Sequence, residues 1–83
     1  MPTGEYVEYR LWEGHSMKAY RICNFGPSWV MVTIWDPDNP MDRSNELPLQ
    51  ASDCIDVEGK GILLRLGILS KPGAYAKGTY ERL

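Results

Sequence analysis

The single histidine, His15, is the first residue to consider for catalysis. A serine or cysteine nucleophile needs a neighbouring base, and histidine is the usual one at neutral pH. His15 follows Gly14 in a segment typical of a surface turn, and no serine stands in a nucleophile elbow. Cys23 and Cys54 are far from His15 and lack the close-paired spacing of a structural zinc site. These residues predict neither nucleophilic catalysis nor bound zinc.

The acidic loop DPDNPMDRSNE, residues 36–46, is the second candidate for chemistry. It carries five side chains with the oxygen atoms that Ca²⁺ prefers: Asp36, Asp38, Asn39, Asp42 and Glu46. An EF-hand beginning at Asp36 would need Asp or Asn, then Gly, where the chain has Pro40 and Met41, and Glu where it has Leu47. An EF-hand is therefore excluded. The composition predicts a solvated loop, and an irregular calcium site stays open.

The other familiar catalytic patterns are also missing. Gly59 and Gly61 do not form a GxGxxG motif, and no helix is predicted after them. Asp53 and Asp56 flank a short apolar run, but nothing in the sequence pairs them across a substrate cleft. We expect no enzyme, no catalytic residue, no metal and no cofactor.

The elements that would position such residues belong to one domain, residues 1–83. A chain of this size buries about 60% of its unfolded surface, so it usually needs a disulfide, a metal or a partner. Two cysteines are fewer than a secreted disulfide scaffold carries, and we interpret them as buried reduced thiols, with one bridge still possible. The N-terminal MPTGEYVEYR lacks the basic start and apolar run of a secretory signal peptide. No run reaches the roughly 18 apolar residues of a membrane helix.

Charge is unevenly distributed along the chain. The net charge is −2, but residues 36–58 sum to −6 and residues 59–83 to +4. Ordinary solvated faces would explain this, and so would complementary patches through which copies dock head to tail. The overall balance argues against a nucleic-acid binder. Aromatic residues among the bases of residues 6–21 leave a single-strand reader of the OB type open.

The dominant hydrophobic period is two, which predicts strands. Segments of this kind are EYVEYRLW, WVMVTIW, CIDV and GILLRLGIL, with weaker ones before Cys23 and at the C-terminus. Gly and Pro clusters separate them, and Glu58-Gly59-Lys60-Gly61 predicts a hairpin. We expect an all-β fold, a small antiparallel β-sandwich or barrel of about five to six short strands.

The segment SWVMVTIW has apolar side chains on both faces. Val30, Val32 and Ile34 fit a core face, which leaves Trp29, Met31 and Trp35 on the other. Either the terminal segments and the loop 37–48 cover these three, or they form an interface. We favour an interface. Its predicted residues are Trp29, Met31, Trp35, Leu63 and Leu69, with Arg65 and the acidic loop (Asp36, Asp38, Asp42 and Glu46) at the rim.

Two segments carry a resemblance to a known group of proteins. CNFGPSWVMVTIWD is a turn followed by a strand, and LPLQASDCIDVEGKGILLRL is a short strand, a glycine turn and a long apolar strand. This order, over about half the chain, resembles small β-sandwich accessory proteins of bacteriophage virions, such as capsid decoration, minor capsid and fibre or spike modules. The resemblance implies a non-enzymatic part, present in many copies on or between larger proteins.

The sequence therefore predicts a structural or interaction module of a phage particle. It would be made in the host cytoplasm, end in the virion, and bind copies of itself or a larger virion protein rather than nucleic acid or a membrane. The alternative is a small acidic phage inhibitor that binds a host defence or nucleic-acid-handling protein through residues 36–58.

Overall fold

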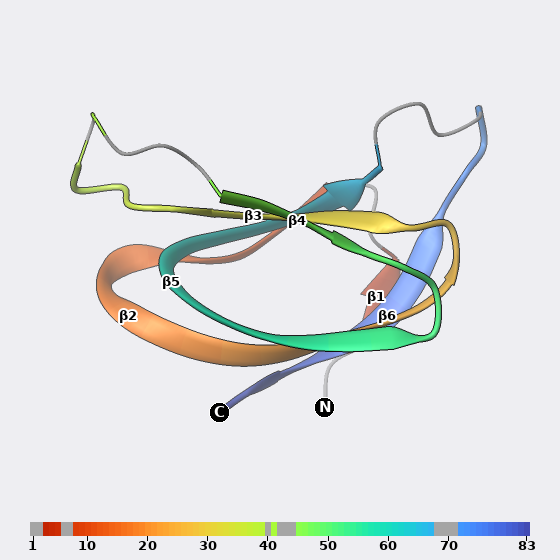
Figure 1. Cartoon of the computed structure of the whole chain (residues 1–83), viewed down its shortest axis with the longest axis horizontal. Coiled ribbons are helices and arrows are strands. Elements are labelled where there is room, and N and C mark those ends of the chain that lie inside the picture. The colour runs from red at the N-terminus through yellow and green to blue at the C-terminus, as the bar shows by residue number, and fades with distance from the viewer. Residues whose placement is uncertain (1–2, 6–7, 40, 42–44, 68–71) are drawn as a thin grey trace.

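A computed structural model describes residues 3–5, 8–39, 41, 45–67 and 72–83. It contains six strands: β1 (Thr3–Glu5), β2 (Glu8–Pro27), β3 (Val30–Trp35), β4 (Asn45–Leu49), β5 (Asp53–Leu66) and β6 (Ala76–Arg82). They form one antiparallel sheet in the order β1-β6-β2-β5-β3-β4 (Figure 1). The predicted all-β antiparallel fold is confirmed. Within the described ranges, no helix has the length and apolar character needed to cross a membrane.

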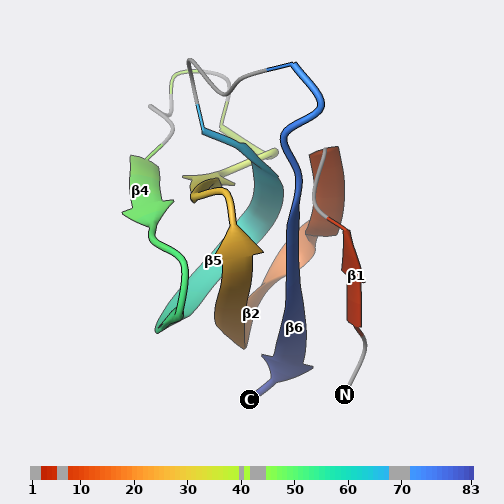
Figure 2. The same ribbon diagram turned by 90° about the vertical axis from the view of Figure 1, so that its right-hand side faces the viewer.

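Two long strands roll this sheet into two layers. The second half of β2 pairs with the first half of β5 and with β6, whereas the first half of β2 pairs with the second half of β5. The register shifts at the bend: Glu13 pairs with Gly61, and Lys18 pairs with Gly59. The bend therefore contains more residues of β2 than of β5. Figure 1 shows both strands curving there, and Figure 2 shows β6 between β1 and β2 in one layer. The number of strands agrees with the five to six predicted, but CIDV and the start of GILLRLGIL, predicted as separate strands, are parts of the single long strand β5.

The hairpin predicted at Glu58–Gly61 is wrong, because these residues continue through the bend of β5. Glycine serves a tight bend in a strand as well as a turn, so both structures give the same sequence signal. A Cβ on Gly59 would lie 2.6 Å from Cγ2 of Ile34. The side chain of Ile34 thus occupies the space that any larger residue at position 59 would need.

The core lies between the two layers. Its fully or nearly buried members are Ile22, Val30, Val32, Leu49, Val57, Ile62, Leu64 and Ala76. On β3, the predicted inward residues Val30 and Val32 are buried and Ile34 is partly buried. On β5, Val57, Ile62 and Leu64 are buried, whereas Ile55 and Leu66 are partly buried. The inward positions of β5 are odd-numbered before the bend and even-numbered after it, because the alternation slips between Gly59 and Ile62.

A buried amide ties two turns together at one end of the core. Asn24 is fully buried, and its Nδ2 donates to the carbonyl oxygens of Ser28 at 2.9 Å and Leu49 at 3.0 Å. Its Oδ1 accepts from the backbone N–H of Gly26 at 2.8 Å. Gly26 has a φ of 82°, a conformation that glycine adopts without strain. Both the amide nitrogen and the amide oxygen of Asn24 are therefore hydrogen-bonded, and the side chain holds the β2–β3 turn against the end of β4.

The prediction of two reduced, buried thiols is wrong. Cys23 of β2 and Cys54 of β5 are direct cross-strand neighbours, with Cα atoms 4.0 Å apart, and form a disulfide. Cys54 is exposed and Cys23 half-buried, because both side chains point away from the core. The pairing depends on a register between strands that are distant in the sequence.

Candidate interaction face

One side of β3 faces away from the core, and we call it and its neighbours the β3 outer face. Alternation along β3 places Trp29, Met31, Thr33 and Trp35 on this side. Residues directly opposite each other in an antiparallel pair share a face. The register therefore adds Leu63 and Arg65 of β5, and Glu46 and Pro48 of β4. Five of the six predicted interface residues lie on this face, and Leu69 lies outside the described residues.

Each tryptophan of this face lies over a glycine: Trp35 over Gly61 of β5, and Trp29 over Gly67, which directly follows β5. Trp35 is paired with Gly61, and a Cβ on Gly61 would fall far inside van der Waals contact with the Trp35 ring. Gly67 donates its N–H to the carbonyl oxygen of Trp29 at 3.1 Å, and its missing Cβ leaves room for the Trp29 ring in the same way. Both rings are half-buried. Glycines thus cover one part of each ring, and the remainder stays accessible.

Trp12, the third tryptophan, repeats this arrangement on β2. A Cβ on Gly14 would lie 2.7 Å from its ring. Its Nε1 donates to the carbonyl oxygen of Ser16 at 3.0 Å, and Nζ of Lys18 is 5.4 Å from the ring centroid. This ring therefore helps to hold the bend of β2 in place.

Polar groups in the middle of the β3 outer face are incompletely satisfied. Thr33 is only 8% exposed, and its Oγ1 has no hydrogen-bond partner among the described residues. Nη2 of Arg65 donates to Oε1 of Glu46 at 2.6 Å, whereas Nε of Arg65 is buried and also without a partner in the described part. Buried polar groups without partners are costly, so these two atoms lower the stability of this part of the sheet.

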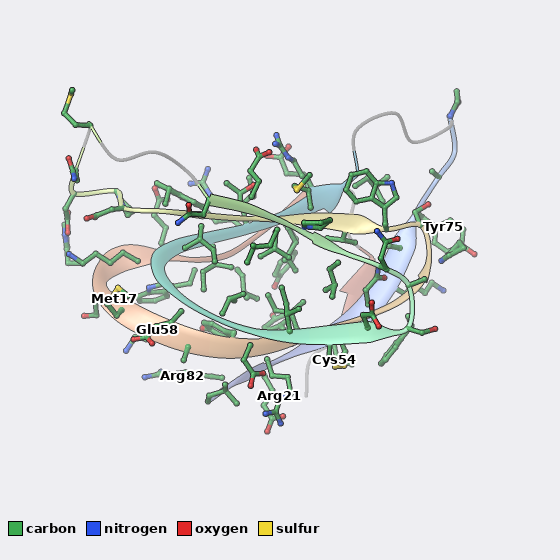
Figure 3. All side chains as sticks on the ribbon, in the orientation of Figure 1. Met17, Arg21, Cys54, Glu58, Tyr75 and Arg82 are labelled. Carbon is green, nitrogen blue, oxygen red and sulfur yellow. A yellow bond between two sulfur atoms is a disulfide. The ribbon has the colours of Figure 1, made fainter. Side chains whose placement is uncertain are left out.

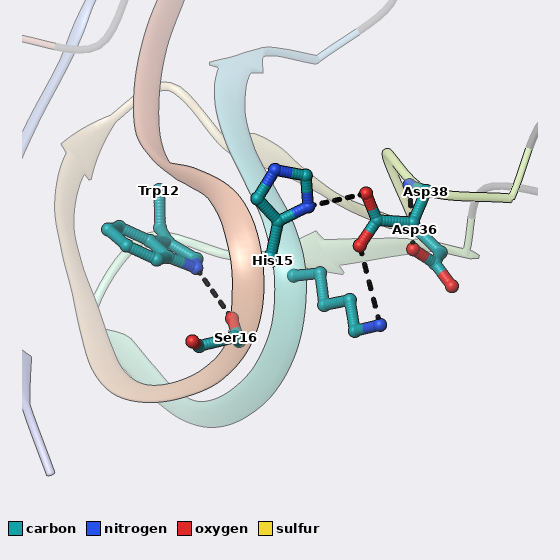
Figure 4. Close-up of polar contacts among 6 residues, drawn as sticks. Trp12, His15, Ser16, Asp36 and Asp38 are labelled. Atoms are coloured by element: carbon teal, nitrogen blue, oxygen red, sulfur yellow. Dashed lines mark hydrogen bonds and ion pairs between the residues drawn. The ribbon is translucent and has the colours of Figure 1, made fainter.

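The acidic loop does not act as one unit. Oδ1 of Asp38 contacts Nδ1 of His15 at 2.6 Å, and its Oδ2 lies 3.6 Å from Nζ of Lys60 (Figure 4). Asp36 accepts the backbone N–H of Asp38 at 2.9 Å. Glu46 belongs instead to the β3 outer face, and Asp42 lies outside the described residues. Among the residues that the structure describes, no three potential ligands gather into a metal site.

The aromatic residues behind the open single-strand-binding alternative, within residues 6–21, do not share one environment: Tyr20 is partly buried against the core, Trp12 lies at the bend, and Tyr6 is outside the described residues. Tyr20 and Tyr80 pack against the core, with ring centroids 6.2 Å apart in an edge-to-face contact. The hydroxyls of Tyr9 and Tyr80 are 2.7 Å apart. This hydrogen bond is the main cause, and burial the second, of a rise in the pKa of Tyr80 to about 12. Tyr9 is 39% exposed, so the single-strand-binding alternative stays open.

Several exposed apolar residues were not singled out from the sequence. Phe25 is 60% exposed, Met17 52% and Tyr75 42%. Met17 and Glu58 lie at the end of the molecule opposite Tyr75 (Figure 3). Met17 lines a cleft at the bend of the two long strands. The sequence could have indicated Met17 as a contact residue, because an apolar side chain in a polar, turn-like segment is expected to be exposed to water.

Comparisons with known proteins give no relative for this chain. No family model, no curated protein and no solved structure matches it.

Proposed function

We propose that this protein is a non-enzymatic structural module that self-associates through the β3 outer face. The observation that carries the proposal is the row of half-buried apolar side chains on that face: Trp29, Met31, Trp35 and Leu63. β3 pairs with β4 and β5 at its edges and packs over the core on its inner side, so no described strand lies over the outer one. Apolar and aromatic side chains of this kind are enriched in the centres of protein interfaces.

The packing of the tryptophans favours binding. Because Gly61 and Gly67 accommodate the rings, Trp29 and Trp35 are already held in position in the free chain. A side chain that is fixed before association loses less rotamer entropy when a partner covers it. Rigid aromatic rings therefore present contact area at a low entropic cost.

A second copy of the chain is the occupant that the charges favour. A two-fold interface uses the same patch on both subunits, so that patch must be complementary to itself. Arg65 and Glu46 place both signs of charge side by side on the β3 outer face. A neighbouring copy can thus place its Glu46 carboxylate near Arg65 and its Arg65 guanidinium near Glu46.

The acidic run does not present a surface suited to the inhibitor alternative. Three of its carboxylates are paired with bases from outside the run: Asp38 with Lys60, Glu46 with Arg65, and Asp56 with Arg21. These pairs lie on different parts of the molecule, so the three paired carboxylates are not concentrated on one face. The virion as the place of assembly follows from the sequence resemblance alone and stays a prediction.

The experiment that tests this proposal compares two methionine-to-glutamate variants. Met31→Glu puts a charge in the centre of the β3 outer face, whereas Met41→Glu puts the same charge on a side chain that is 86% exposed. Sedimentation velocity should show Met31→Glu at a smaller mass than the wild type, and Met41→Glu unchanged. Equal masses for all three folded proteins would overturn self-association through this face.

A further inference from the structure

A cleft of about 220 Å³ opens where both long strands bend. It is lined by Met17 of β2, by residues 34–36 at and just after the end of β3, by Asn45 of β4, and by residues 58–60 of β5. It is separate from the centre of the β3 outer face, because Met31, Leu63 and Arg65 do not line it. Trp35 is the residue that both share.

The apolar part of the cleft is built from Met17, Ile34 and Trp35. Gly59 also lines the cleft, and because it has no side chain the Ile34 side chain packs directly against it. The volume exceeds the roughly 150 Å³ of an apolar cavity that binds benzene. The cleft therefore has room for a group the size of one long side chain.

The charged part of the cleft is net negative. Asp36 and Glu58 contribute carboxylates, and Lys60 contributes the only ammonium among the lining residues. Nζ of Lys60 lies 3.6 Å from Oδ2 of Asp38, which is not part of the lining, so its charge is balanced from outside. Two carboxylates beside a tryptophan ring and a thioether match a cation on an aliphatic stem.

We propose that this cleft receives an arginine side chain from a protein partner. The planar guanidinium can stack on the Trp35 ring while it donates hydrogen bonds to Glu58, and the methylene stem contacts Met17 and Ile34. This inference rests on the proposed role as an interaction module and adds what the partner offers at this end of the molecule.

The test is an NMR titration of the ¹⁵N-labelled protein with n-butylguanidinium, a free analogue of the arginine side chain. We expect saturable shifts at the Trp35 indole N–H and at the amides of Gly59 and Lys60, with half-saturation on the order of millimolar, as a small ligand allows. The neutral isostere n-butylurea should bind much more weakly. Added salt should weaken the guanidinium because screening reduces its attraction to the carboxylates.

Two variants locate the contact. Glu58→Gln should raise the half-saturation concentration about fivefold, as loss of one partly exposed charge partner would. Glu81→Gln removes an exposed carboxylate on β6 that does not line the cleft and should leave it unchanged. Equal binding of n-butylurea, an unchanged Glu58→Gln variant, or shifts only elsewhere would overturn the arginine cleft.

The outcome can be separated from that of the proposed function. The probe is monomeric and is read at residues of the cleft, so it binds or fails to bind whether or not the chain self-associates. A protein that self-associates but ignores n-butylguanidinium would overturn only the cleft, and a monomer that binds it would overturn only self-association.

Discussion

The two outer faces of the rolled sheet differ in chemistry although β5 contributes to both. On the layer that contains β6, the outward residues include the Cys23–Cys54 disulfide and the Arg21–Asp56 pair, and we call this side the β6 outer face. On the other layer, β5 contributes Leu63 and Arg65 to the β3 outer face. The β6 outer face is polar and is cross-linked by a disulfide, whereas the β3 outer face is aromatic and apolar.

This difference indicates that the β6 outer face contributes to stability and that the β3 outer face has the capacity to bind a partner. On the β6 outer face, two N–H groups of Arg21 donate to the two carboxylate oxygens of Asp56, at 2.8 and 3.1 Å, so the pair is satisfied within the chain. On the β3 outer face, Thr33 Oγ1 and Arg65 Nε lack partners in the described part, and the apolar side chains remain half-buried. A face that is satisfied internally needs no partner, whereas an incompletely covered apolar face gains from one.

The largest effect on the free energy of unfolding is expected from removing the Cys23–Cys54 disulfide. Changing both Cys23 and Cys54 to serine opens a loop closed across 31 positions, and should lower the free energy of unfolding by about 2–4 kcal/mol. Denaturant titration of the variant and of the wild type, with and without reductant, measures this. The solution mass of the folded variant should match that of the wild type, because the disulfide is on the β6 outer face. A variant as stable as the wild type would contradict this account of the β6 outer face.

A smaller effect is expected from filling the space under one tryptophan. Gly67→Ala would place a Cβ in the Trp29 ring, and should cost about 1–3 kcal/mol as the ring is displaced. It should also weaken self-association, since the ring leaves its position on the β3 outer face. Sedimentation velocity and denaturant titration measure the two effects on the same sample.

A double-mutant cycle sharpens this test. In a Trp29→Ala background there is no ring to displace, so Gly67→Ala should cost much less than it does alone. Additive effects of the two substitutions would mean that the glycine and the ring do not interact as described.

The smallest effect is expected from the exposed ion pair. Hydrogen bonds from Arg21, together with its charge, lower the pKa of Asp56 below its ordinary value of 3.8. A lowered carboxyl pKa stabilises the fold at pH values above the ordinary one, and this contribution disappears as the pH falls through the lowered value. The stability difference between wild type and Asp56→Asn should therefore be fully present at neutral pH and shrink as the pH falls below 3.8.

Asp53→Asn is the matched control for this prediction, because the structure records no ion pair for Asp53 among the described residues. Its difference from the wild type should change less with pH. A difference for Asp56→Asn that is constant with pH would show that the pair with Arg21 does not stabilise the fold.

The residues of single strands were predictable, and the relations between strands were not. The period of two in β3 predicted that Val30 and Val32 lie inward and Trp29 and Met31 outward, because alternation is a local property. The disulfide and the Trp29–Gly67 contact depend on which strands pair and in what register. A single sequence does not contain that register in readable form.

The bend explains the remaining errors of the sequence analysis. Gly59-Lys60-Gly61 gives the same signal for a hairpin and for a bent strand, and only the pairing of β5 with β2 on both sides distinguishes them. The same bend brings His15 and Lys60 to Asp38, which no local pattern indicated, while the described loop residues 37–39 are exposed as predicted. The cleft arises there as well, from segments that are far apart in the sequence.

The most direct test of the central claim is the solution mass of the wild-type chain by light scattering after size exclusion, over a concentration series. Self-association through the β3 outer face predicts a mass that rises with concentration from 9.5 kDa toward that of a defined oligomer. A constant mass of 9.5 kDa up to high concentration would contradict it.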